Sequence, residues 1–286
     1  MFTHARALTA VWLLCTVAGC CCTQSLARRQ LSDVRYAEGV ALYEQGDYRG
    51  AIAEYDAAIE LNPSHAWAYN GRGLAWSELG EFDRAISDHE EALRLEPNNA
   101  DGYHGRGYAW AGKEEHGKAI ADFNEAIRLD SSIAEAFHNR ALAFQNQGDL
   151  DEALRDYNKA VALDPSSGVT FHGRASVLES QGDLDRAMAD YDRALQFDPT
   201  NAVAYNDRGQ LWTKLDDTEK AIDDLNQAIR LDPEMSEARH NRGDAWYNRG
   251  EYASAVADYE AAIRLDPANN IWHHNHGEAA CFIEQY

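Results

Sequence analysis

A pattern of 34 residues recurs along most of this sequence and constrains its fold more than any other feature. The stretch from Ala66 to Asn99 is one copy of the pattern. With Ala66 as position 1, alanine occupies positions 20 and 27 in seven consecutive copies, and all six prolines fall on position 32. A fixed period of this length indicates an array of small units that each pack only on their neighbours. We therefore expect one elongated domain rather than two.

Each copy contains two segments with the three- and four-residue spacing of a helix face. Tyr69, Gly73 and Trp76 (positions 4, 8 and 11) share one face, and Ala85 and His89 (positions 20 and 24) share a face with position 27 on the second segment. Small residues at positions 8, 20 and 27 allow two helices to approach closely. Large side chains at positions 11 and 24 can then fill the space between them. The pattern predicts a pair of helices per copy.

Glycine and proline mark the turns between these helices. Glycine at position 15, found in five copies, suits the left-handed residue that closes a helix, and an acidic residue always follows it. Proline at position 32 is expected to stop the second helix. The third copy, residues 100–133, departs most, because Glu114 replaces the glycine and Ser131 the proline. We expect the array to be least stable there.

Positions 8, 11, 20, 24, 27 and 32 together resemble the motif of the tetratricopeptide repeat family. The resemblance implies an all-α fold, a right-handed superhelical solenoid of antiparallel helix pairs with a concave groove lined by the first helix of each pair. Because most members of the family bind peptides or partner proteins, it also implies a non-catalytic binding scaffold. The resemblance covers seven units, followed by a capping helix over 270–286: residues 32–65, 66–99, 100–133, 134–167, 168–201, 202–235 and 236–269.

The first 31 residues lie outside these units. Residues 1–19 contain Arg6 and an apolar run from Ala7 to Ala18, which is typical of a secretory signal peptide and short for a membrane span. The adjoining Val17-Ala18-Gly19-Cys20 resembles the bacterial lipobox, which implies a lipid on Cys20 and a place at the cell envelope, facing the periplasm or the exterior. An ordinary cleaved signal or an apolar anchor is the alternative. Residues 20–31 are expected to form a tether.

The charge of the chain restricts its partners. The 26 basic and 48 acidic residues give a formal net charge of −22, which opposes attraction to phosphate backbones and anionic lipid. We therefore expect no nucleic-acid partner and membrane contact only through a lipid anchor. The expected partner is a protein or extended peptide that is neutral or basic. The oligomeric state stays open.

One row of polar residues is predicted to be structural. Arginine recurs at position 7 in six copies, from Arg72 to Arg242, and an acidic residue recurs at position 23, from Glu54 to Asp258. Both positions lie beside the buried faces of their helices. Because buried arginine is usually paired, ion pairs between helices of the same or adjacent units are favoured over a row that binds anions.

A second row, at position 5, is predicted to lie on the groove side of the first helices. Lysine and arginine are absent from positions 2, 5, 6, 9 and 12, so the basic clamp with which peptide-binding relatives hold a terminal carboxylate is missing. The histidines of the row are interpreted as ordinary groove-wall residues, and a pH- or metal-responsive sensor is the alternative function. The candidate partner-binding residues are Trp67, Asn70, His104, Tyr108, His138, His172, Asn206 and His240.

No arrangement in the sequence indicates an enzyme. There is no serine or cysteine nucleophile in a strained glycine-rich turn and no glycine loop for phosphate, so we expect neither catalytic residues nor cofactors. His273, His274 and His276 are the best metal-ligand candidates, and a polar helix cap is the favoured interpretation of them. We therefore predict no metal site.

Overall fold

The computed structural model describes residues 26–285, and these form helices joined by short turns, with no strand among them. The predicted signal peptide and Cys20 lie outside the described residues. The chain divides into two compact units, Met1–Gln147 and Gly148–Tyr286. The division falls between the two helices of the fourth predicted repeat.

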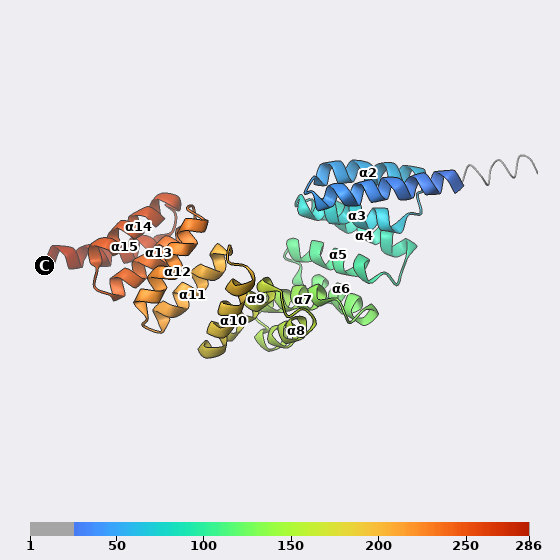
Figure 1. The fold of residues 1–286 in the computed structure, drawn as a ribbon. Helices are drawn as coiled ribbons and strands as arrows, with labels where there is room; N and C mark the ends of the chain where they lie inside the picture. Colours follow the sequence, from blue (N-terminus) through green and yellow to red (C-terminus); the bar gives the residue numbers. More distant parts are fainter. Residues whose placement is uncertain (1–25, 286) are drawn as a thin grey trace, which may run out of the picture. The chain divides into compact units, whose positions relative to one another are not determined.

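The first unit consists of successive helices that pack side by side (Figure 1). The first helices of neighbouring pairs also contact one another, as α3 does with α5 and α5 with α7. In chain order the helices are one over residues 26–44, α2 (Tyr48–Leu61), α3 (Ala66–Glu78), α4 (Phe82–Leu95), α5 (Ala100–Gly112), α6 (His116–Leu129) and α7 (Ala134–Gln147).

The second unit repeats the arrangement (Figure 1). The all-α fold of packed helix pairs is therefore confirmed. The last helix packs on α14 and buries Trp272 and Ala279, which are 4% and 0% exposed, whereas Gly277 faces open space. The helices are α8 (Leu150–Leu163), α9 (Gly168–Ser180), α10 (Leu184–Phe197), α11 (Ala202–Lys214), α12 (Thr218–Leu231), α13 (Ser236–Asn248), α14 (Tyr252–Leu265) and α15 (Asn270–Gln285).

The core of each helix pair is built around the side chain at position 24, as the sequence predicts. His89 is fully buried, and a Cβ atom added to Gly73 would lie 2.8 Å from its ring. The first helix of the next unit also approaches the ring at position 24. Tyr55 shows this second contact, because a Cβ atom on Gly71, at position 6, would lie 2.7 Å from it. Sequence reasoning identified the position-8 contact and missed the one at position 6.

The turn after each first helix has the predicted left-handed residue. The five glycines at position 15 have φ values from 74° to 85°, while Glu114 and Asp216 adopt φ of 61° and 63° where glycine is missing. This backbone is costly for a residue with a side chain. The missing proline has less effect: α6 ends at Leu129 like its equivalents, and Asp130 Oδ1 accepts a hydrogen bond from the Ser132 amide at 2.9 Å. This side-chain turn closes the helix without proline.

The tether predicted over residues 20–31 is wrong from residue 26 on, because the first residues that the structure describes are already helical. Residues 26–31 are good helix formers and include no glycine or proline, so the helix extends upstream of the first predicted repeat. Ser32 lies inside this helix, fully buried, and its Oγ donates to the Ala58 carbonyl at 2.8 Å. Among the described residues, no helix combines the length and the apolar character that a membrane span needs.

Candidate binding groove

The arginine row forms ion pairs, as predicted. Arg174 donates from Nε and Nη2 to the two carboxylate oxygens of Asp190 at 2.6 and 2.8 Å. Its Nη1 donates to Asn158 Oδ1 of the preceding helix at 2.9 Å. Arg72 is paired with Asp88 in the same way, and this hydrogen bond is the main cause that raises the pKa of Arg72. The row therefore joins helices and offers no free cations to an anion.

The row at position 5 connects neighbouring first helices. His104 Nε2 lies 3.0 Å from Asn139 Nδ2, and His172 Nε2 lies 2.8 Å from Asp207 Oδ2. In each case position 5 meets position 6 of the next unit. Asn206 and His240 make the equivalent contacts, with Asn241 at 2.9 Å and Asn275 at 3.0 Å. These side chains therefore connect neighbouring first helices through hydrogen bonds.

Asn70 is the exception in this row. It is 4% exposed, and its Oδ1 lies 2.9 Å from His89 Nδ1 within the same helix pair. The aromatic side chains at positions 2 and 9 are the exposed ones, with Trp67 at 41% and Tyr108 at 40%. Both side chains are accessible to a partner.

A cavity of about 560 Å³ in the first unit brings four of the eight predicted residues together. We call it the aromatic groove. The side chains come from the first helix and from α2, α3, α5 and α7. His138 lies half-buried on α7 of the same unit, and His172, Asn206 and His240 belong to the second unit. The groove is lined by Tyr36, Val40, Tyr43, Glu44, Tyr55, Trp67, Asn70, Gly71, Leu74, Glu78, Asp101, His104, Tyr108, Glu135 and Asn139.

Four carboxylates line this groove, and no lysine or arginine does: Glu44, Glu78, Asp101 and Glu135. Burial raises the pKa of Tyr43 to about 12, and the Glu78 carboxylate adds to the rise. Burial also lowers the pKa of His104, while Glu135 and Asp101 act in the opposite direction. Sequence analysis noted the missing bases but did not notice these acids, which stand at positions 2 and 13 of consecutive units.

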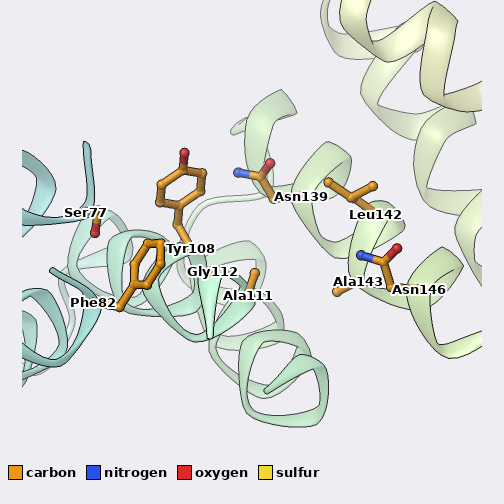
Figure 2. A pocket seen from close by; sticks show the side chains of 9 residues that line it. All are labelled: Ser77, Phe82, Tyr108, Ala111, Gly112, Asn139, Leu142, Ala143 and Asn146. Carbon is orange, nitrogen blue, oxygen red and sulfur yellow. The ribbon is translucent and has the colours of Figure 1, made fainter. Parts of the chain in front are cut away.

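A second cavity, of about 260 Å³, adjoins the aromatic groove and shares Tyr108 and Asn139 with it. We call it the apolar pocket. Figure 2 shows Phe82 and Tyr108 on one side of it and Leu142 on the other. Gly112 contributes no side chain, where the equivalent residues of the neighbouring units are glutamate and asparagine. The remaining lining residues are Ser77, Ala111, Ala143 and Asn146.

The histidines of α15 have separate partners. His273 Nε2 lies 3.2 Å from the Pro267 carbonyl, whereas His276 lies 3.6 Å from Glu260. Within residues 26–285, no three histidine, cysteine, aspartate or glutamate side chains are grouped so that they could hold a metal ion.

Comparison with known families and structures agrees with the repeat pattern. Models described as tetratricopeptide or TPR repeats match residues 39–80, 66–99, 134–167, 174–240 and 236–269, together about two-thirds of the chain. No curated protein matches the sequence.

Three similar solved structures illustrate the fold. The hetero-tetramer Cut9-Hcn1 of APC/C gives a TM-score of 0.77 at 16% identity, over 86% of this chain and 49% of that one, so this chain spans about half its length. A tetratricopeptide repeat protein from Parabacteroides merdae gives a TM-score of 0.63 at 17% identity, over 88% of this chain and 99% of that one. YrrB, described as a TPR protein with an unusual peptide-binding site, gives 0.52 at 26% identity, over 65% and 96%.

Proposed function

We propose that this chain, which belongs to the tetratricopeptide repeat family, is a non-catalytic scaffold that binds a protein or an extended peptide segment in the aromatic groove. The family's fold is typical of protein–protein interaction, and YrrB provides a precedent for a peptide site on such an array.

The observation that carries this proposal is the exposure of two large aromatic side chains inside one cavity. Trp67 and Tyr108 are 41% and 40% exposed and line the groove from α3 and α5. Tryptophan and tyrosine in a concave surface are the residues that most often dominate the energy of protein interfaces. Their position indicates an extended ligand that crosses several first helices.

The charge of the groove indicates the kind of ligand. Its four carboxylates, with no lysine or arginine beside them, favour a neutral or basic segment and disfavour an acidic one. The chain's net charge of −22 acts in the same direction at longer range, and it opposes nucleic acid.

The location follows from the sequence of the leader. A signal peptide over residues 1–19 and a lipobox-like segment before Cys20 support export and lipid attachment at the cell envelope. We propose that the repeat array is held at the membrane by this lipid.

The experiment is affinity capture of a partner with the region that follows Cys20, compared between the wild type and Trp67→Ala/Tyr108→Ala. We expect the double variant to bind the captured partner at least about thirtyfold more weakly, because it loses two aromatic anchors. Phe197→Ala is the matched control, since Phe197 is also 41% exposed but lies in the second unit. Circular dichroism checks that helical content is unchanged. Equal affinity of wild type and double variant would show that the partner binds elsewhere.

A further inference from the structure

The aromatic groove and the apolar pocket form adjoining parts of one surface. Tyr108 and Asn139 line both cavities, so a ligand that occupies one can enter the other without leaving the protein. The two parts differ in chemistry. The groove carries carboxylates and aromatic rings, whereas the pocket is lined mainly by apolar side chains such as Phe82 and Leu142.

The groove suits a cation. Its carboxylates come from four different helices, and none of them forms an ion pair with a basic side chain in the described part of the chain. Aromatic rings, which attract cations to their faces, stand among them. Burial raises the pKa of Tyr43 in this groove to about 12, and the nearby Glu78 carboxylate adds to the rise. A negative potential of this kind favours a positive ligand group.

The apolar pocket suits a single side chain. Its volume of about 260 Å³ lies below the range of about 300–1,000 Å³ that is usual for whole small-molecule ligands. Leu142, which is 43% exposed, and the ring of Phe82 offer apolar contact. The side-chain amides of Asn139 and Asn146 also line the pocket, where they can form hydrogen bonds with a peptide backbone.

We propose that the surface recognises an extended peptide segment in which a lysine or arginine lies next to a bulky apolar residue. The cationic side chain occupies the aromatic groove, and the apolar side chain occupies the adjoining pocket. This inference rests on the proposed function, because it specifies the ligand of the same site.

The test uses synthetic peptides with blocked ends, a glycine–serine background and a central pair of residues. Arg-Leu is compared with Glu-Leu and Arg-Ser by fluorescence polarisation against the region that follows Cys20. We expect Arg-Leu to bind most tightly. Replacing arginine by glutamate should weaken binding at least about tenfold, because attraction becomes repulsion, and replacing leucine by serine about tenfold, because the buried apolar area is lost.

Variants of the protein locate the effect. Neutralising Glu78, Asp101 and Glu135 as Glu78→Gln/Asp101→Asn/Glu135→Gln should lower the affinity for Arg-Leu about tenfold, by removal of several charge contacts. Leu142→Asn should remove the preference for Arg-Leu over Arg-Ser. The matched control, Glu60→Gln/Glu90→Gln/Glu114→Gln, makes the same change of charge at exposed sites of the first unit outside the groove and should bind like the wild type.

Two outcomes overturn the inference. One is that the three peptides bind alike, or that none binds. The other is that the preference for Arg-Leu is unchanged when the groove is neutralised. Either result leaves the proposed function standing if Trp67→Ala/Tyr108→Ala still releases the captured partner, so the two failures are distinguishable.

Discussion

At the scale of single residues, His89 shows how one repeat differs from the others. Other copies have tyrosine, phenylalanine or leucine at position 24, whereas the imidazole of His89 is fully buried and bonded to Asn70. In some other copies the order is reversed, and a histidine at position 5 packs against the ring at position 24, as His104 does on Phe123 at 5.8 Å between centroids. In these copies the exchange keeps one histidine and one other large side chain at the contact. Nε2 of His89 has no protein partner for a hydrogen bond.

This histidine predicts a loss of stability in acid. Burial lowers the pKa of His89 from 6.5 to about 3. Below about pH 6.5 the unfolded chain binds a proton at this imidazole, whereas the folded chain binds it only near pH 3. The contribution of neutral His89 to the free energy of unfolding is therefore fully present above pH 6.5 and decreases as the pH falls towards 3. Between pH 7 and 5 the wild type should lose about 2 kcal/mol more than His89→Phe. Urea denaturation at both pH values measures this, and equal losses in the two proteins would contradict it.

At the scale of helices, the arginines at position 7 hold three elements together. Arg174 of α9 is bonded to Asp190 of α10 and to Asn158 of α8. Its side chain and that of Asp190 are only 17% and 9% exposed. Removing one member of a buried pair is costly because the other charge stays behind without its partner.

Arg174→Ala should therefore destabilise the protein by about 3 kcal/mol. Arg155→Ala is the control, because Arg155 pairs with Glu152 on the surface, where the two side chains are 67% and 48% exposed, and exposed pairs contribute about 0–1 kcal/mol. Chemical denaturation of both variants gives the comparison. If Arg174→Ala leaves the denaturation midpoint unchanged, solvent already screens this ion pair.

The helices and their turns were predictable because their causes are local and repeat. Alanine at positions 20 and 27 specifies close packing in seven copies, and glycine at position 15 specifies the left-handed turn in five of them. Contacts between copies were harder to predict. The close approach of Gly71 to Tyr55 and the hydrogen bond between His104 and Asn139 join residues that no short-range spacing connects. Trp67 and Tyr108 were identified as groove residues from their side of the helix. The four carboxylates beside them could not be predicted without knowing which four helices meet at the groove.

At the scale of the whole molecule, the chain combines a long acidic array with an apolar leader. The net charge of −22 gives the array little affinity for anionic membrane surfaces, so the proposed place at the membrane rests on the leader. The leader offers Cys20 for this purpose, by resemblance to a lipobox.

Replacing this cysteine tests the anchor. Cys20→Ser should abolish incorporation of labelled fatty acid and release the protein from the membrane fraction, or leave it unprocessed. The neighbouring Cys21→Ser should be labelled like the wild type, because the modified cysteine directly follows the cleavage site. Labelling of Cys20→Ser at the wild-type level would rule out lipid attachment at this residue.

The arginine contacts also bear on how such a gene can change in length. Arg242 reaches sixteen residues forward to Asp258 and sixteen residues back to Asn226. Loss of residues 202–235 by recombination would place Asp192 where Asn226 stands, and both side chains offer an oxygen to the same guanidinium. Unequal crossing-over in steps of one repeat therefore exchanges equivalent partners, while a deletion of any other length separates them. The arginine contacts between helices therefore allow the number of repeats to change during evolution by whole repeats.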